Sequence, residues 1–367
     1  KAQHADLVIF AEQAVSGTPA FDLLRKTTFL ELCEDALVEI ASCCDGIAAI
    51  VGLPILTADG TISAAALIQD RKVLRYIGKK YITARREMGF LVPSKGYEYA
   101  TIKGHKCAII VGDDLSRERD FDQSVETVIS INARKYGKGT MIYRYEMMRN
   151  LAFVESKNLV LVNQVGGSTD IVYDGTSGAL NSRGELVLMM KNFEEDFQIF
   201  DTKASARPIT IPSTYNDRTR LVYEAARCGL RDFFRKNGYR KASIGLSGGI
   251  DSAVVASIAA DALGAENVRA LLMPSPFSSL ESVEDAKELA RNLGIEYNVI
   301  PISEIYTSVV NTLKPVIGGT EFDATEENIQ TRIRTVLLMA VQNKTDYILL
   351  NSSNKSENAL GLCTLYG

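Results

Sequence analysis

The chain has 367 residues, of which 46% are hydrophobic and 23% are charged, and its formal net charge is -4. Length and balance indicate a globular protein of two domains, and the small negative charge gives no electrostatic footprint for nucleic acid or an acidic membrane. No apolar run approaches the roughly 18 residues that indicate a membrane span, so neither nucleic acid nor a membrane is an expected partner.

The cysteines are scattered along the chain, without a C-x-x-C pair and without a histidine partner. They are Cys33, Cys43, Cys44, Cys107, Cys228 and Cys363. Neither a zinc site nor a disulfide framework is indicated, and reduced thiols are typical of a cytoplasmic protein. Because the only histidines are His4 and His105, we do not expect a mechanism built on histidine.

Short apolar runs alternate with helical segments in the first half of the chain. Runs of strand length lie at 6–10, 47–56, 65–69, 107–111 and 158–164, and a helix is expected near 28–44. This alternation predicts a strand-rich α/β domain with layered sheets.

A segment with two prolines and no helical period, ARPITIPSTYN at 206–216, separates the two halves. It follows an acidic run, and a helical stretch begins near Asp217. We therefore expect a first domain over 1–205, a linker over 206–216 and a second domain over 217–367. Because the chain stops at Gly367 in the middle of a pattern, we expect the second domain to be incomplete at its C-terminus.

The second half alternates strands and helices at the spacing of βαβ units. Strands are predicted at 242–246, 268–273, 296–300 and 347–351, and helices at 251–263, 281–293 and 327–343. Such alternation predicts a doubly wound parallel sheet. Ligands of such sheets bind beyond the carboxyl ends of the strands. The segments at these ends are GLSGGIDSAV (245–254), MPSP (273–276) and NSSNKSE (351–357).

The loop GLSGGIDSAV leads from a strand through a glycine turn into a helix, which points free backbone N–H groups at an anion. We expect Gly248 and Gly249 to take conformations that a side chain would forbid. The hydroxyls of Ser247 and Ser252 can donate to phosphate oxygens. Because the loop holds no lysine, it is not the pattern that cradles a triphosphate. The alternative is a glycine turn that Asp251 caps without any ligand.

Asp251 would repel phosphate unless a cation lies between them, and Mg²⁺ held by one or two carboxylates resolves that conflict. The last of the three segments holds Asn354, Lys355 and Glu357 in a polar loop that should face the same crevice. Glu357 can share the ion with Asp251. The alternative for Glu357 is a glutamate favoured at a helix start by the helix dipole.

Two arginines, Arg332 and Arg334, come at the start of the helix predicted over 327–343. Arginine at a helix start opposes the dipole unless an anion is near, so both are candidates for phosphate contact. The apolar positions of this helix are expected to pack on the sheet; they are Ile329, Ile333, Val336, Leu337, Met339 and Ala340.

The motif SGGIDS resembles the pyrophosphatase loop of the ATP pyrophosphatase group, whose members cleave ATP between the α and β phosphates and adenylate a substrate. The segments MPSPFSSLESVEDAKELARNLGI, EENIQTRIRTVLLMAVQNK and NKSENALGLCTLYG resemble NAD synthetase in particular. The resemblance implies a Rossmann-like domain that binds ATP, Mg²⁺ and deamido-NAD. It implies ATP contacts from Ser247, Gly248, Gly249, Asp251, Ser252 and Met273, metal ligation by Asp251 and Glu357, and substrate contacts from Asn328, Arg332, Asn354 and Lys355. The family's Thr-Thr-Gly is replaced here by Asn351, Ser352 and Ser353.

The segment FAEQAVSGTPAFDLL (10–24) resembles the nitrilase-like glutaminase domain that is fused to glutamine-dependent NAD synthetases. This resemblance implies an α-β-β-α sandwich in which a cysteine thiolate attacks the glutamine amide. By the same resemblance Glu12 is the base, and Lys79 in IGKKYITARRE supports the developing oxyanion.

The nucleophile position itself is occupied by Gly112, in IIVGDDLSRE. Cys107 lies five positions earlier, where strand alternation places it on the opposite face, and is more typical of a core cysteine. Three alternatives stay open: a natural glutaminase that has degenerated and relies on free ammonia, an engineered inactive form, or a register broken by missing residues. Ala11 and Ser116, which also depart from the family pattern, favour natural divergence.

We therefore predict an enzyme of NAD biosynthesis, a ligase that amidates deamido-NAD through an adenylated intermediate, with glutamine or ammonia as the nitrogen source. The family resemblance implies a homo-oligomer. Two alternatives remain. One is an ammonia-only synthetase whose first half is a non-catalytic structural module. The other is a different amidating or thiolating ATP pyrophosphatase.

Overall fold

The computed structural model describes residues 4–85, 87–203, 207–318 and 321–361. It divides into two compact units, unit 1 (residues 1–229) and unit 2 (residues 230–367). The division lies within helix α3 (Arg218–Asn237). The described part of the expected linker, 207–216, precedes this helix and holds one short 3-10 helix, η3 (Ser213–Tyr215).

Unit 1 contains two sheets and a small antiparallel ribbon. The first sheet, in the order β1-β2-β3-β4, consists of β1 (Leu7–Ile9), β2 (Ala48–Thr57), β3 (Gly60–Gln69) and β4 (Lys72–Gly78). The second, in the order β12-β11-β8-β7-β6-β5, consists of β5 (Glu98–Ile102), β6 (His105–Val111), β7 (Thr127–Asn132), β8 (Asn158–Asn163), β11 (Gly178–Leu180) and β12 (Leu186–Met189). The ribbon pairs β9 (Val165–Ser168) with β10 (Ile171–Asp174).

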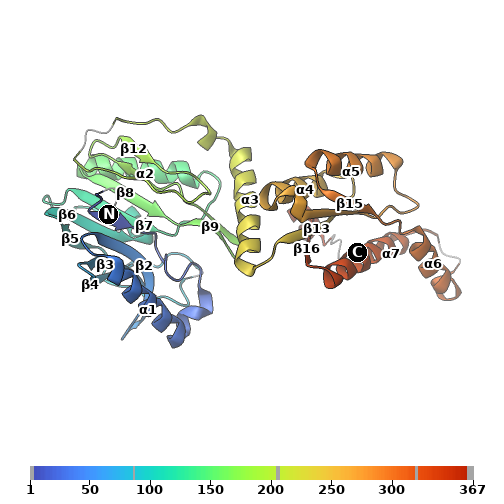
Figure 1. Cartoon of the computed structure of the whole chain (residues 1–367), viewed down its shortest axis with the longest axis horizontal. Coiled ribbons are helices and arrows are strands. Elements are labelled where there is room, and N and C mark those ends of the chain that lie inside the picture. The colour runs from blue at the N-terminus through green and yellow to red at the C-terminus, as the bar shows by residue number, and fades with distance from the viewer. Residues whose placement is uncertain (1–3, 86, 204–206, 319–320, 362–367) are drawn as a thin grey trace. The chain divides into compact units, whose positions relative to one another are not determined.

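The two sheets of unit 1 pack face to face, and a helix covers each outer face (Figure 1). Ile50 and Leu67 of the first sheet meet Ile109 and Ile129 of the second in one apolar layer. Helix α1 (Thr27–Cys43) packs outside the first sheet, and helix α2 (Thr140–Glu155) packs outside the second. Strands buried on both faces read as continuous apolar runs, as 47–56 does. The expected α-β-β-α sandwich is confirmed.

Unit 2 is built on a parallel sheet in the order β15-β14-β13-β16. Its strands are β13 (Lys241–Gly245), β14 (Val268–Leu272), β15 (Glu296–Val299) and β16 (Tyr347–Leu350). Its helices after α3 are α4 (Ile250–Leu263), α5 (Leu280–Leu293), α6 (Ser303–Ile317), α7 (Ala324–Lys344) and α8 (Lys355–Leu360), and η4 (Ala265–Asn267) is a 3-10 turn. These bounds match the predicted strands and helices to within a few residues; the prediction did not include α6.

Helices cover both faces of this sheet (Figure 1). Helices α4 and α5 pack on one face around Ile244 and Ala270, and α6 and α7 pack on the other around Leu271 and Ile333. The expected doubly wound parallel sheet is therefore confirmed. The chain leaves β13 toward β14 on one side and returns to β16 on its other side, so the strand order reverses between the ends of β13 and β16. Such a switch point is where ligands of this architecture bind.

Two expectations about helix α7 are wrong. The helix begins at Ala324 and is capped by Asp323, so Arg332 and Arg334 lie more than two turns inside it and away from the positive end of its dipole. Ile329, Ile333 and Leu337 pack in the apolar layer as expected, but the side chain of Val336 is 66% exposed and that of Met339 is also exposed. The six apolar positions span a wider arc around the helix than the side that packs on the sheet.

The remaining whole-chain expectations concern thiols and membranes. None of the described cysteines, which are all except Cys363, forms a disulfide, and most of them are buried. Cys363 lies outside the described residues. In the part of the chain that the structure describes, no helix is both long and apolar enough to cross a membrane.

Candidate functional site

The glycine turn after β13 is shaped by a close contact with α5. Gly248 has a φ of +88°, and a β-carbon there would lie 2.3 Å from the carbonyl oxygen of Ser282. Only glycine fits such a position. Gly249 has an ordinary φ of -83° and is the N-cap of α4, so the expectation that both glycines need special conformations holds for Gly248 alone.

The two serines of this turn hold the turn together. The Ser252 side chain is buried, donates to the carbonyl oxygen of Gly249 (2.9 Å) and accepts from the backbone N–H of Ser247 (3.2 Å). The Ser247 hydroxyl accepts from the backbone N–H of Gly249 (3.1 Å) and remains exposed. The Ser252 hydroxyl thus bonds within the turn in this structure. Ser247 is the serine at the surface of the site.

A cavity of about 500 Å³ opens at the switch point of the sheet, within the usual range for a small-molecule site. It is lined by residues that follow β13, β14 and β16 and by faces of α5 and α7. Of the sequence-predicted site residues, the lining includes Ser247, Gly249, Asp251, Ser252, Met273 and Glu357. Residues from three different segments therefore meet at one edge of the sheet.

Asp251 and Glu357 are brought together by Asn354. The Asn354 side-chain amide donates to Oδ1 of Asp251 (3.3 Å), and its side-chain oxygen accepts from the backbone N–H of Glu357 (2.9 Å). The Glu357 carboxylate accepts from the backbone N–H of Asn354 (2.9 Å), which completes a capping box at the start of α8. Glu357 is therefore a helix-start glutamate and a cavity residue at the same time.

These two carboxylates set the charge of the cavity. Together with Arg334 they are the charged side chains of its lining, so the lining carries one net negative charge. Within the described residues, no three or more side chains of histidine, cysteine, aspartate and glutamate gather into a metal site. Two carboxylates are what Mg²⁺ takes from a protein when phosphate oxygens and waters complete its shell, so the residues fit that ion.

Helix α7 gives the cavity a face that the sequence analysis did not identify. Its lining residues are Thr331, Arg334, Thr335, Leu338, Met339 and Gln342, most of them spaced by three or four positions along one side of the helix. Nε of Arg334 donates to the carbonyl oxygen of Met273 (3.1 Å), and burial lowers the pKa of its guanidinium. Only the helical period of α7 could have indicated this face.

The other predicted substrate contacts lie outside the lining. Arg332 is two residues from Arg334, about 200° around the helix, and is exposed. Asn328 is half-buried one turn earlier on α7, and Lys355 is exposed in the first turn of α8. All three belong to helices that border the cavity, but none of their side chains contributes to its wall.

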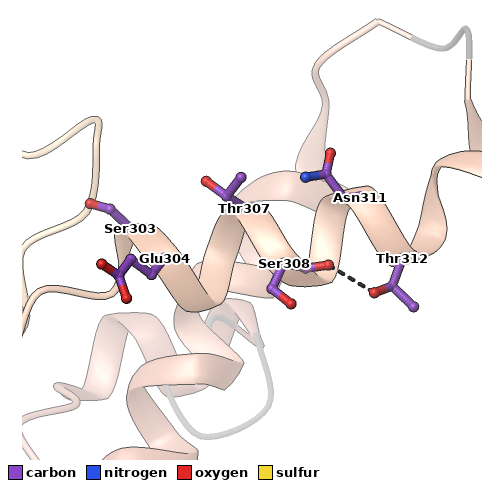
Figure 2. Close-up of a pocket in the computed structure, with 6 residues that line it drawn as sticks. All are labelled: Ser303, Glu304, Thr307, Ser308, Asn311 and Thr312. Carbon is purple, nitrogen blue, oxygen red and sulfur yellow. Dashed lines mark hydrogen bonds between the residues drawn. The ribbon is translucent and has the colours of Figure 1, made fainter.

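A second hollow lies along helix α6 (Figure 2). Its lining residues are Ser303, Glu304, Thr307, Ser308, Asn311 and Thr312. All come from one helix, and the Thr312 hydroxyl donates to the carbonyl oxygen of Ser308 (2.8 Å). With a single charged group and no second element facing them, these residues do not converge on a ligand.

Unit 1 contains a buried cluster around Glu12, whose side chain is 2% exposed. Its Oε1 accepts from the Ser63 hydroxyl (2.9 Å) and pairs with Nζ of Lys79 (3.1 Å), and its Oε2 accepts from the backbone N–H of Ala133 (3.1 Å). The segment that carries Glu12 crosses β2 at Gly52, where a β-carbon would lie 2.3 Å from the carbonyl oxygen of Ala11. Close packing and three hydrogen bonds fix this carboxylate.

Lys79 bridges two carboxylates. Its Nζ lies 3.1 Å from Oε1 of Glu12 and 2.9 Å from Oε2 of Glu87. Burial disfavours the ammonium, but the charges of Glu12 and Glu87 outweigh it, so the pKa of Lys79 is raised. Burial and the charge of Glu12 raise the pKa of the Glu87 carboxyl. Sequence analysis missed Glu87, although it is the last residue of the IGKKYITARRE segment.

Gly112 lies where Glu12 and Lys79 meet. It follows β6 at the start of a 3-10 helix, η2 (Gly112–Ser116), with a φ of +63°. A β-carbon there would lie 2.7 Å from Cε of Lys79 and 2.9 Å from Oε2 of Glu12. Cys107 instead faces the apolar layer between the sheets, and burial raises the pKa of its thiol to about 12. The cluster thus converges on a residue that has no side chain.

Comparison with known proteins agrees with both halves of this description. The family model of NAD synthase matches residues 222–367. Over its whole length the chain is 35% identical to the glutamine-dependent NAD(+) synthetases of Acinetobacter baylyi and Synechocystis sp., of which it covers 70% and 71%. It also superposes over its whole length, at 34% identity and a TM-score of 0.88, on 71% of the glutamine-dependent NAD+ synthetase of Acinetobacter baumannii, solved in complex with adenosine diphosphate.

Proposed function

Because the chain belongs to the family of glutamine-dependent NAD(+) synthetases, we propose that it is a ligase that amidates deamido-NAD to NAD with ATP, and that the cavity of unit 2 holds the reaction. A nicotinate carboxylate oxygen attacks the α-phosphorus of ATP, and pyrophosphate leaves. Ammonia then attacks the acyl carbon of the adenylate, and AMP leaves. The nitrogen comes from glutamine or from free ammonia.

The observation that carries this proposal is the meeting of a glycine turn, a helix start and two carboxylates at the switch point of a parallel sheet. Gly249 caps α4 without a side-chain oxygen, so the first N–H groups of this helix have no capping side chain. Such N–H groups bind phosphate. They would stabilise the negative charge that develops on pyrophosphate as the α–β bond breaks.

Mg²⁺ is the metal that this site would hold, through Asp251 and Glu357. When bound, it supplies positive charge to the phosphate oxygens. Asn354 keeps the two carboxylates side by side through its bonds to both residues. Without a cation, the net negative lining would repel a triphosphate, since Arg334 is the one positive side chain among the lining residues.

Asn328, Arg332 and Lys355 are proposed contacts for parts of the dinucleotide that extend beyond the cavity wall. Their support is their place on α7 and α8, the two helices that border the cavity. Arg332 and Lys355 are exposed, which leaves their charges available to a dinucleotide's phosphates.

The test is formation of AMP, pyrophosphate and NAD by the full chain from ATP, deamido-NAD, Mg²⁺ and ammonium. Asp251→Asn should lower the rate about 100-fold or more, since it removes a charge placed at the phosphates. The matched control is Asp346→Asn, which changes an exposed aspartate paired with Lys241 just before β16, at the opposite end of the sheet. A chain that forms no AMP and no pyrophosphate, or that loses equal activity with both variants, would contradict the proposal.

A further inference from the structure

Unit 1 contains a buried carboxylate and a buried ammonium beside a residue that has no side chain. The buried carboxylate of Glu12 and the ammonium of Lys79 both lie within 3.0 Å of the place that a β-carbon of residue 112 would take. Covalent amide hydrolysis needs a nucleophilic side chain within hydrogen-bond reach of such a base. Gly112 has no atom that can form the bond.

The turn that presents residue 112 is nevertheless firmly built. The Asp114 carboxylate is buried and accepts from the backbone N–H groups of Lys80 (2.7 Å) and Tyr81 (2.8 Å). The Asp113 carboxylate accepts from the Thr83 hydroxyl and pairs with Arg134 (3.2 Å). These bonds tie the turn after β6 to the segment that follows Lys79, so residue 112 is held against the base and the cation. The backbone geometry of a nucleophile position is present without the nucleophile.

No described thiol takes this position. Cys107 belongs to the apolar layer between the sheets, Cys44 to the layer beneath α1, and Cys228 to an apolar cluster with Phe193. The other two described cysteines, Cys33 and Cys43, lie within helix α1. The atoms nearest to the β-carbon position of residue 112 belong to Lys79 and Glu12.

We propose that unit 1 is an amide-hydrolysing framework without its nucleophile, and that the synthetase takes its nitrogen from free ammonium rather than from the amide of glutamine. This inference rests on the proposed function for the use of that nitrogen. The step that is missing is the attack of a nucleophile on the amide of glutamine. A nucleophile would bond to the amide carbon, the base would carry its proton to the amide nitrogen, and the carbon–nitrogen bond would break to release ammonia. Water would then hydrolyse the bond between the acyl carbon and the nucleophile, which releases glutamate and restores the nucleophile. The first of these bonds cannot form at Gly112.

The first experiment compares nitrogen sources with the full chain. We expect NAD from ATP and deamido-NAD with ammonium but not with glutamine, and glutamate release from glutamine no faster in the natural chain than in its Glu12→Gln variant. Glutamate release that Glu12→Gln removes would overturn the inference. Failure to form NAD with ammonium would instead contradict the proposed synthetase, while the glutamate measurement would still decide the question for unit 1.

The second experiment introduces a thiol at residue 112. Gly112→Cys places a thiol beside Glu12 and Lys79, whose tips are the ends of flexible side chains and can move aside. We expect glutamate release at least about 100-fold above that of Gly112→Ala, which is the low end of what a positioned base contributes. We also expect an electrophilic glutamine analogue to label the thiol. Gly112→Ala is the matched control, because it brings the same backbone strain and the same β-carbon without sulfur.

If Gly112→Cys has the melting temperature of Gly112→Ala but releases no glutamate and is not labelled, the framework is not an amide site and the inference is wrong. If Gly112→Cys does not fold, the comparison of glutamine with ammonium in the natural chain decides alone.

Discussion

At the scale of single residues, unit 1 depends on one buried cation. Lys79 is 3% exposed, and its single positive charge pairs with both Glu12 and Glu87. A buried carboxylate that loses its counter-charge is strongly destabilising, because solvation no longer compensates it.

Lys79→Met should lower the free energy of unfolding of unit 1 by about 3–5 kcal/mol at pH 8, measured by urea denaturation. Without Lys79 the pKa of the Glu87 carboxyl, which burial already raises, rises further above its unfolded value. Protonation then relieves the penalty, so the loss should shrink as the pH falls toward 5.

The control for this prediction is Lys80→Met, which removes the neighbouring lysine and its ion pair with Glu118 (3.1 Å). The side chain of Lys80 is 42% exposed, so solvent already screens its charge. Equal losses from the two variants, or a loss from Lys79→Met that grows at low pH, would contradict the charge argument.

At the scale of elements, the synthetase site is set by how the turn after β13 touches α5. The carbonyl oxygen of Ser282 leaves no room for a side chain at Gly248, so the turn and α5 fix each other's position. The start of α4 is held in turn by the hydroxyl of Ser252. The first N–H groups of α4 are therefore positioned by the turn after β13, which α5 holds in place, and not by α4 alone.

Gly248→Ala should lower synthetase activity at least tenfold and destabilise unit 2 by about 1–3 kcal/mol, because its β-carbon would displace backbone rather than a flexible side chain. The matched control is Gly238→Ala. Gly238 has a similar φ, +73°, but its added β-carbon would meet nothing within 4 Å. Steady-state kinetics and denaturation of both variants separate the collision from the backbone strain; similar losses in both would rule out the collision with α5.

At the scale of the whole molecule, each unit encloses its own hydrophobic layers. In unit 1 one layer lies between the two sheets, and in unit 2 apolar layers lie on both faces of the parallel sheet. Units with separate cores unfold in separate steps unless a strong interface couples them.

Calorimetry of the full chain should accordingly show two transitions. Lys79→Met should shift only the transition of unit 1, and Gly248→Ala only that of unit 2, because each substitution changes contacts inside one unit. A single transition that both variants shift equally would show that the chain unfolds as one cooperative body.

Some elements of the fold could be predicted from the sequence, and others could not because of the residues that they bury. The runs 242–246 and 268–273 are strands because they are apolar, short and bounded by turn residues. Helix α2 was missed because its buried side carries Arg144, which pairs with Asp174 at 3.1 Å in the interior. A charged residue in a core interrupts the apolar period on which a helix prediction depends.

The residues of the candidate site also divide into those that the sequence predicts and those that only the folded structure identifies. The turn residues Ser247 and Asp251 lie four positions apart in the sequence and belong to one recognisable motif. The cavity face of α7 has no such motif. It combines polar and apolar residues at helical spacing, and the packing of the helix shows that this side faces the cavity. Arg334 rather than Arg332 lines the cavity for that reason alone.

Residue order and residue type were enough to predict the two architectures, the glycine turn, the pair of carboxylates and the absence of a thiol at residue 112, because each of these is a local property of the chain. Folding was needed to show that Glu12, Lys79 and Glu87 form one buried network against Gly112, and that Asn354 joins Asp251 to Glu357. These contacts join residues from 8 to 103 positions apart. Such proximity arises from the pairing of strands and the packing of helices, which no local pattern encodes.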